Sequence, residues 1–359
     1  MTAAQRIRFC DTALVHARTA ETAEAAVQEV LRSGGWVGGP VVARAEAALA
    51  RTVGRNHGVG MASGTAALQA ILSALGVGRG DDVIVPAVSF VASATAVLRA
   101  GARPVLVDVL PGMPLLDPAA VSAALSPAVK AVVAVSLFGN RVPALSLPDR
   151  VTLVDDAAQA MGRTASCGDG VAQAFSFYPT KVLAAAGDGG LVTTDDPGLA
   201  ARVRSLGKHG RTAEGAFRSV GGTTPGNNRL DAVQAALLHA RLPDLSVRVA
   251  WRRRLLARYL QQLPDLVLPH DDGSNVAVLV AVHPQRDRLR TELQAQGIET
   301  GCYYPRPLTA EPVLEAAHVP HPVPNAERFC ATCLALPCHI GLSESDIDHV
   351  CARVREVLA

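Results

Sequence analysis

Between residues 58 and 194 the chain alternates short, wholly apolar runs with stretches of helical periodicity, and this alternation restricts the possible folds strongly. Strands that are apolar on both faces must be covered on both sides, which is typical of a mostly parallel sheet flanked by helices. The sequence therefore predicts an α/β fold with a buried sheet. The predicted strands are residues 83–86, 104–107, 131–137, 152–154, 172–177 and 191–194.

The regions on either side of this stretch have a different pattern. Residues 21–32 and 41–53 have helical periodicity, and residues 230–263 are nearly all helical. Residues 275–283, 284–296 and 298–304 then predict strand, helix and strand, before a helical tail at 343–358. We therefore predict a large domain over residues 1–250 and a smaller α+β domain over residues 251–359, with the N-terminal segment packing partly on the smaller domain.

Composition excludes several classes of protein. Lys and Arg number 34 and Asp and Glu number 32, so the basic excess that nucleic acid or an anionic membrane would need is missing. No apolar run approaches the roughly 20 residues that span a bilayer, and the N-terminus lacks the apolar core of a signal peptide. The seven cysteines are an odd number and are scattered, unlike a disulfide framework. We expect a cytoplasmic protein with reduced thiols and neither a nucleic-acid nor a membrane partner.

Two polar segments follow predicted strands and indicate a ligand site. Ser63-Gly64-Thr65 opens a helix, where backbone N–H groups and the helix dipole attract an anion; an ordinary N-cap is the alternative. Asp155-Asp156 ends a buried strand, where α/β sheets place ligand contacts. A carboxylate there needs a cationic partner such as a protonated heterocyclic nitrogen, and a helix cap is again the alternative.

The segment from residue 174 to residue 190 holds Lys181 between apolar neighbours, after a strand that ends near Ser176. Desolvation lowers the pKa of such a lysine and frees its neutral amine to form a Schiff base. The alternative is a surface lysine in a loop. The order of the pieces, with an anion-type turn, an acid after a strand and then the lysine, favours the first interpretation.

This order resembles the pyridoxal-phosphate-dependent sugar aminotransferases of the DegT–DnrJ–StrS family. The resemblance extends from about residue 33 to residue 337 and implies the aspartate-aminotransferase fold, known as fold type I. The matching segments, in chain order, are WVGGP, SGTAAL, GRGDDVIVPAVSF, GARPVLVDV, DDAAQAMG, FSFYPTKVLAAAGDGG, GNNRLDAVQAA, GIETGCYYPRP and LPCH.

The resemblance implies two catalytic residues. Lys181 matches the lysine that carries the cofactor as a Schiff base, and Asp156 matches the acid that pairs with the pyridinium nitrogen. It also implies a homodimer with shared active sites, in which an Asn reaches the phosphate of the other subunit. The residues that match the family's cofactor-binding positions are Gly64, Thr65, Phe90, Asp156, Gln159, Ser176, Lys181 and Asn227.

The activity that the resemblance implies is transfer of an amino group from L-glutamate or L-glutamine to a keto-sugar or keto-cyclitol, in secondary-metabolite or cell-envelope sugar biosynthesis. A nucleotide-linked sugar is the expected acceptor. Departures from the family pattern lie near the acceptor: Gly226 and Asn228 replace aromatic residues, Tyr303 replaces a histidine, and Thr309 replaces another. The candidate substrate residues are Tyr303, Tyr304, Arg229 and His339.

Alternatives to this activity remain on the same scaffold. A sugar dehydratase of the family would carry His where this chain has Lys181, so the lysine favours transamination over dehydration. A lyase that forms an aromatic amino acid and a non-catalytic regulatory paralogue are the other two alternatives.

Three further segments allow two interpretations each. Cys330, Cys333, Cys338 and His339 are either a zinc site or buried free thiols, and we favour the thiols and predict no metal. The basic run from residue 251 to residue 254 is either a solvated helix face, which we favour, or a region that approaches an anionic nucleotide, as the family resemblance implies. The polar loop over residues 211–222 is either solvated or reaches toward the substrate of the partner subunit, which we favour.

Overall fold

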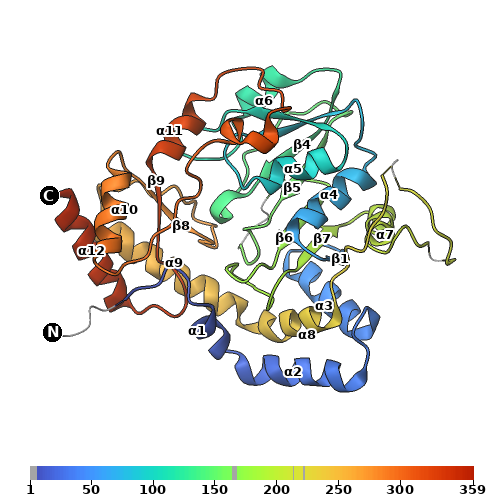
Figure 1. Ribbon diagram of the computed structural model, residues 1–359, viewed down its shortest axis with the longest axis horizontal. Helices are drawn as coiled ribbons and strands as arrows, with labels where there is room; N and C mark the ends of the chain where they lie inside the picture. The colour runs from blue at the N-terminus through green and yellow to red at the C-terminus, as the bar shows by residue number, and fades with distance from the viewer. Residues whose placement is uncertain (1–5, 164–167, 213, 221–222) are drawn as a thin grey trace.

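The computed structural model describes residues 6–163, 168–212, 214–220 and 223–359, and its centre is a seven-stranded sheet of order β1-β7-β6-β5-β4-β2-β3 (Figure 1). Strand β7 is antiparallel to both of its neighbours, and the other pairings are parallel. The prediction of a mostly parallel sheet is confirmed, and every predicted strand of this region lies within two residues of an observed one. The strands are β1 (His57–Met61), β2 (Asp82–Pro86), β3 (Arg103–Val107), β4 (Val129–Val135), β5 (Thr152–Asp156), β6 (Ala172–Ser176) and β7 (Gly190–Thr194).

Helices cover both faces of this sheet, as its apolar strands require. Val85 of β2 packs in the same cluster as Leu68 and Val97 of the helices on one face, whereas the adjacent Ile84 packs in the cluster of Val121 on the other. Helix α8 packs against α2 and α3 beneath β6 and β7 (Figure 1). The helices of this part are α1 (Thr12–Ala17), α2 (Ala20–Ser33), α3 (Gly39–Thr52), α4 (Gly64–Ala74), α5 (Ala92–Arg99), α6 (Pro118–Ala124), α7 (Pro197–Leu206) and α8 (Ala232–Arg241).

Short polar side chains determine where these helices begin. Ser63 accepts a hydrogen bond from the N–H of Ala66 at 3.1 Å and caps α4 directly after β1. Asp196 and Asp231 cap α7 and α8 in the same way. Helices α4 and α7 therefore begin directly after the strands that precede them, which brings the N-terminus of α4 to the edge of the sheet.

The C-terminal part forms around a two-stranded antiparallel sheet of β8 (Leu279–Val282) and β9 (Cys333–Leu336). Its core joins residues of α9, α10 and α12 with Ile7 from the N-terminal segment. The boundary predicted after residue 250 falls inside α9, so the division into domains stays a prediction. The helices are α9 (Leu245–Gln262), α10 (Arg286–Ala295), α11 (Pro324–Thr332) and α12 (Glu344–Leu358), and the short 3₁₀ turns are η1 (Leu137–Gly139), η2 (Leu242–Asp244), η3 (Leu308–Ala310) and η4 (Pro312–Leu314).

The strand predicted over residues 298–304 is wrong. Ile298 forms a single bridge with Ile7, and Gly301 forms a single bridge with Ala335 of β9. Because these two pairings have different partners, no continuous ladder forms. The segment instead crosses from the N-terminal residues to β9, and it carries Tyr303 and Tyr304 beyond that point.

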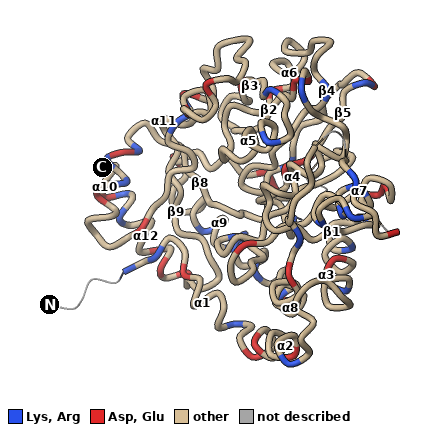
Figure 2. Tube along the Cα trace, turned by 45° about the vertical axis from the view of Figure 1, so that its right-hand side comes forward, with Lys and Arg blue, Asp and Glu red and all other residues tan. Residues whose placement is uncertain are grey.

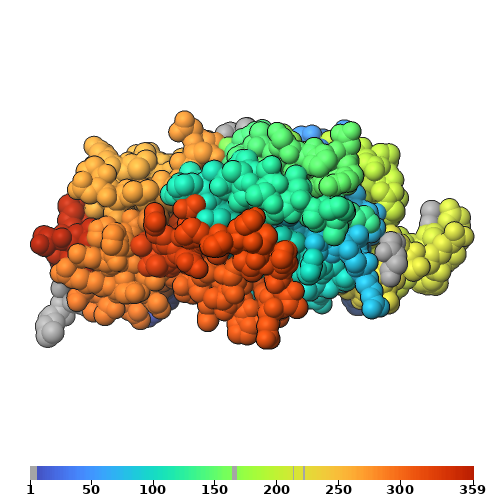
Figure 3. All heavy atoms as spheres, turned by 90° about the horizontal axis from the view of Figure 1, so that it is seen from above, coloured from blue at the N-terminus to red at the C-terminus, as the bar shows by residue number. Residues whose placement is uncertain are grey.

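The surface shows mixed charge and one projection. Basic and acidic residues are interspersed over the described chain (Figure 2). No described helix has the length and apolarity that crossing a bilayer demands. The segment around Arg211 and Phe217, which form a bridge with each other, projects from the end of the molecule opposite the C-terminal part (Figure 3). Residues 213, 221 and 222 of the loop predicted over 211–222 lie outside the described residues.

Candidate active site

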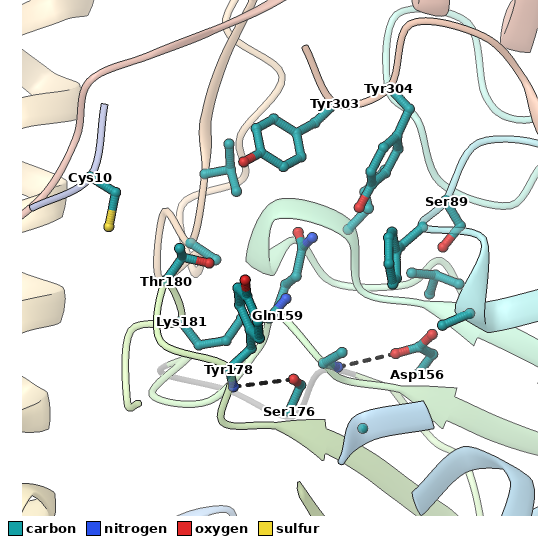
Figure 4. A pocket seen from close by; sticks show the side chains of 18 of the residues that line it. Cys10, Ser89, Asp156, Gln159, Ser176, Tyr178, Thr180, Lys181, Tyr303 and Tyr304 are labelled. Atoms are coloured by element: carbon teal, nitrogen blue, oxygen red, sulfur yellow. Dashed lines mark hydrogen bonds between the residues drawn. The ribbon is translucent and has the colours of Figure 1, made fainter. Parts of the chain in front are cut away.

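A cavity of about 610 Å³ lies where the carboxyl ends of β5 and β6 face β8, β9 and the N-terminal segment. Ligands of open α/β sheets bind at such carboxyl ends. Figure 4 shows side chains from these separate segments pointing toward one another. The predicted site residues that line this cavity are Gly64, Thr65, Phe90, Asp156, Gln159, Ser176, Lys181, Tyr303, Tyr304 and His339.

Asp156 ends β5 and is buried at the floor of the cavity. Its Oδ2 accepts a hydrogen bond from Ser93 Oγ at 2.7 Å, and its Oδ1 accepts one from the N–H of Ala158 at 3.2 Å. Burial raises the pKa of Asp156, while these hydrogen bonds and the charge of Lys181 oppose the rise. No basic side chain of the described chain forms an ion pair with Asp156, so the carboxylate is suited to a cation that a ligand brings.

Ser93 was not predicted as a site residue. It lies in the first turn of α5, and its Oγ lies 2.6 Å from that of Ser89, which lines the cavity. The two hydroxyls and the carboxylate form a chain of hydrogen bonds that fixes the orientation of Asp156. A serine in a helix is common, and no local pattern in the sequence distinguishes this one.

Lys181 lies on the loop that follows β6, and its side chain points into the cavity (Figure 4). Its N–H donates to Tyr178 O at 2.8 Å, which closes the turn that directs the side chain inward. Burial lowers the pKa of Lys181 to about 8, against the opposing charge of Asp156. The amine is therefore partly neutral near physiological pH and can act as a nucleophile or base.

The N-terminus of α4 forms an anion-type turn at one end of the cavity. Ser63, Gly64 and Thr65 line this turn, with Ser176 from the end of β6 beside it. A Cβ on Gly64 would lie 2.8 Å from Ser176 Cβ, so only glycine lets the helix approach the strand this closely. The free N–H groups of a first helical turn suit a phosphate group.

Aromatic rings form the opposite wall. Phe90 lies with its ring centroid 6.1 Å from that of Tyr304, and Tyr303 stacks on Phe9 at 5.8 Å. Burial raises the pKa of Tyr304, so its hydroxyl stays protonated and can donate a hydrogen bond. Gln159 accepts from the N–H of Phe138 at 2.7 Å, which fixes its side chain inside the cavity, below Tyr303 in the view of Figure 4.

His339 lines the cavity, but both of its ring nitrogens already have protein partners. Nε2 lies 3.2 Å from Arg8 O, and Nδ1 accepts from the N–H of Gly341 at 3.2 Å. Burial lowers the pKa of His339, so the ring is neutral at physiological pH. The ring therefore supports the cavity wall, and only its apolar edges are available to a substrate.

Two predicted residues lie outside this cavity. Asn227 is exposed, and its backbone forms an isolated β-bridge with that of Lys208, near the base of the projecting segment. Arg229 forms an isolated backbone β-bridge with Met61, and it lines a separate small pocket with Glu46 and Arg204. Asn227 is thus free to contact a second copy of the chain, as the family resemblance implies, and this role stays a prediction.

The expectation that residues 251–254 form a solvated helix face is wrong for Arg252. This arginine is buried, lines the cavity and donates from Nη1 to Val276 O at 3.0 Å and to Ala277 O at 3.2 Å. Burial lowers its pKa. Arg248, Arg252, Leu255 and Tyr259 of α9 are all buried, and their spacing of three or four residues could have indicated this inward face.

The cysteines of the suspected metal segment separate in space. Cys338 lines the cavity with His339, whereas Cys330 and Cys333 pack in the core beneath Tyr303 and Tyr304. Within the described residues, no group of three or more His, Cys, Asp or Glu side chains is arranged to hold a metal ion.

Comparison with known proteins identifies the family of the chain. The model of the DegT/DnrJ/EryC1/StrS aminotransferase family matches residues 17–355. A UDP-2-acetamido-2-deoxy-3-oxo-D-glucuronate aminotransferase of Pseudomonas aeruginosa is 33% identical, with 96% of this chain and 99% of the relative covered. A dTDP-3-amino-3,4,6-trideoxy-alpha-D-glucose transaminase of Streptomyces venezuelae is 38% identical, with 98% and 96% covered.

Among solved structures, S. venezuelae DesV in complex with a ketimine intermediate superimposes with a TM-score of 0.89, at 36% identity and with 98% of both chains covered. The 98% of this chain that is covered includes both the seven-stranded sheet and the C-terminal part, so the fold is that of fold type I. The family match and these relatives establish that the chain belongs to the DegT/DnrJ/EryC1/StrS aminotransferase family.

Proposed function

We propose that this aminotransferase uses pyridoxal 5'-phosphate to move an amino group from L-glutamate or L-glutamine to the ketone of a nucleotide-linked sugar. The observation that carries the proposal is Lys181. The chain has three lysines, and Lys181 is the one whose side chain lines the cavity in the described part of the molecule. The relatives named above act on nucleotide-linked sugars, which supports the acceptor class. The cytoplasm stays the predicted location.

The cavity residues fit the cofactor. The turn at Ser63-Gly64-Thr65, with Ser176, suits its phosphate, and Phe90 suits stacking on its ring. Asp156 suits its ring nitrogen, because the buried carboxylate has no basic ion-pair partner among the described residues. When bound, pyridoxal phosphate supplies the electron sink that makes the proton on the donor carbon removable.

The chain's own residues then have distinct tasks. Asp156 keeps the proton on the ring nitrogen, and Ser93 orients its carboxylate. The free Lys181 amine would take the proton from the donor carbon and return it two bonds away, at the carbon on the far side of the nitrogen, in a 1,3-proton shift. The aromatic wall of Phe90, Tyr303 and Tyr304 limits the access of water to this step.

A homodimer with shared sites is part of the proposal. Asn227 is exposed outside the cavity of its own chain, which supports a contact with the cofactor phosphate of a partner subunit. The projecting segment with Phe217, a residue that is 69% exposed, supports the same arrangement, because an apolar side chain on a projection gains from burial in a partner.

The test is reductive trapping of the cofactor. Borohydride treatment of the holoenzyme should attach the cofactor to the peptide containing Lys181, with Lys130 and Lys208 as internal controls in the same digest. Lys181→Ala should lose both the yellow absorbance of bound cofactor and all measurable turnover. Label on Lys130 or Lys208, or normal turnover in Lys181→Ala, would contradict the proposal.

The identities of the amino donor and of the acceptor are tested separately, by running the two half-reactions one at a time. L-glutamate or L-glutamine should bleach the yellow absorbance and release the corresponding keto acid. The aminated cofactor form is then offered nucleotide-linked keto-sugars, free keto-sugars and keto-cyclitols in separate reactions. The yellow absorbance should return with the nucleotide-linked keto-sugars. Return only with a keto-cyclitol would overturn the acceptor class and leave the aminotransferase assignment intact.

A further inference from the structure

Two thiols lie in contact directly behind the aromatic wall of the cavity. Cys302 precedes Tyr303 in the chain, and Cys333 is the first residue of β9. Their Sγ atoms lie 3.8 Å apart. Cys333 is fully buried and Cys302 half-buried, so the pair has one member within reach of a small solute.

A buried cation distinguishes the two sulfurs. Arg286 of α10 is buried, and its Nη1 donates to Cys302 Sγ at 2.9 Å and to the carbonyl oxygen of Cys333 at 3.0 Å. A guanidinium beside a thiol favours the thiolate. The hydrogen bond with Cys333 lowers the pKa of Cys302 to about 7, against the effect of burial and with help from the charge of Arg286.

Cys333 has the opposite character. The hydrogen bond with Cys302 and its own burial raise its pKa, so its thiol stays protonated. Its Sγ contacts the carbonyl oxygen of Tyr304 at 3.4 Å. One member of the pair is therefore nucleophilic and partly exposed, and the other is a protonated partner already in van der Waals contact.

We propose that Cys302 and Cys333 form a peroxide-sensitive oxidation site, in which a hydroperoxide converts the two thiols into a disulfide. The Cys302 thiolate attacks a peroxide oxygen and the O–O bond breaks, which gives a sulfenic acid. The released hydroxide leaves as water with a proton from solvent, which balances the proton that the Cys302 thiol gave up on ionisation. The Cys333 sulfur then attacks the Cys302 sulfur, and the departing hydroxide leaves as water with the Cys333 proton. The two thiols lose two electrons, and hydrogen peroxide is reduced to two molecules of water.

The disulfide should alter the cavity. Its sulfurs must approach from 3.8 Å to about 2.05 Å, and both are tied to the segment that carries Tyr303 and Tyr304. Displacement of a substrate-positioning group by about 1 Å can cost roughly 100-fold in rate. The oxidised protein is therefore expected to lose about tenfold or more in turnover. This effect on turnover rests on the proposed function, whereas the disulfide itself does not.

The direct test is a disulfide map of the full-length holoenzyme. After treatment with hydrogen peroxide and alkylation of free thiols, a tryptic digest should join the peptide of residues 291–328, in which Cys302 is the single cysteine, to the peptide of residues 329–353. No Lys or Arg lies between residues 328 and 353, so the second peptide carries Cys330, Cys333, Cys338 and Cys351 together. Fragment spectra of the wild-type link should assign it to Cys333, and dithiothreitol should remove it.

Two variants separate the pair from its neighbour. Cys333→Ser should abolish the link, and Cys330→Ser, which removes the adjacent buried thiol of α11, should retain it. Peroxide should lower the turnover of the wild type and of Cys330→Ser, and dithiothreitol should restore it. Cys302→Ser should have the same turnover before and after peroxide treatment. A link to Cys330, or no link at all, would overturn the oxidation site. A Cys302–Cys333 link with unchanged turnover would overturn the coupling to the aromatic wall.

Discussion

At the scale of single residues, Asp156 shows how a buried charge is maintained. Removal from water raises its pKa, and the hydrogen bond from Ser93 is the largest opposing effect. A hydrogen bond to a charged group contributes about 1.5–3 kcal/mol, so this serine decides how much of the carboxylate is ionised when the cofactor arrives.

Ser93→Ala should raise the pKa of Asp156 further. Because the carboxylate then takes up a proton at higher pH, the acidic limb of the pH–rate profile should move to higher pH. The measurement is kcat against pH with a saturating donor. Ser73→Ala is the matched control, since Ser73 of α4 is equally buried and its Oγ has no hydrogen-bond partner in the described structure. Identical pH–rate profiles for the two variants would show that Ser93 does not control the ionisation of Asp156.

At the scale of elements, the end of β5 holds two acids with opposite orientations. Asp156 faces the cavity, and Asp155 faces the loop at residues 168–170. A Cβ on Gly170 would come within 2.9 Å of the Asp155 carboxyl, so this loop closes tightly over the acid. Burial raises the pKa of Asp155 to about 6, while hydrogen bonds from Gln173 and from the Gly170 N–H oppose the rise.

A pKa that is higher in the folded state means that the charged form destabilises the fold. The free-energy cost of the charged Asp155 carboxylate is absent below about pH 4, grows between about pH 4 and pH 6, and reaches its full value above about pH 6. Asp155→Asn should therefore stabilise the protein by about 1–3 kcal/mol at pH 8 and by much less at pH 4.5, measured by urea unfolding. The control is Asp169→Asn, an exposed neighbour in an ion pair with Arg141, for which a change below about 1 kcal/mol is expected. A pH-independent difference for Asp155→Asn would contradict this account.

At the scale of the whole molecule, each chain holds all but one of the predicted cofactor-binding residues in its own cavity. Asn227 is the exception, and it lies exposed beyond β1 and α7. Exchange of one residue between two copies related by a twofold axis would complete both sites together.

Mixing two inactive variants tests this exchange. In the proposed homodimer, Lys181→Ala and Asn227→Ala should each be inactive or nearly so before they are mixed. A mixed dimer would contain one site with both residues intact, so random reassociation should restore about a quarter of wild-type activity. Activity that stays at the level of the separate variants after verified subunit exchange would place Asn227 in a role within its own chain.

Local patterns made much of this molecule predictable. The apolar strands and the polar residues that end them lie close together in sequence, so Asp156, Lys181 and the turn at Gly64 could be identified without a structure. Ser93 and Phe9 could not, because their positions depend on contacts with segments far away in the chain. The spacing of residues along α9 could have indicated that Arg252 faces inward, but its run of charges predicted a solvated face. Phe9 and Tyr303, for example, are neighbours only because Ile7 pairs with Ile298.

That pairing of the N-terminal segment has a practical consequence for anyone who prepares the protein. Phe9 and Cys10 form part of the cavity wall, and Ile7 anchors them to the C-terminal part. A truncation that removes residues 6–12 would take Phe9 and Cys10 out of the cavity wall and should therefore alter the catalytic compartment itself. A tag after α12, which ends at Leu358 on the outside of the molecule, leaves that wall as the gene encodes it (Figure 1).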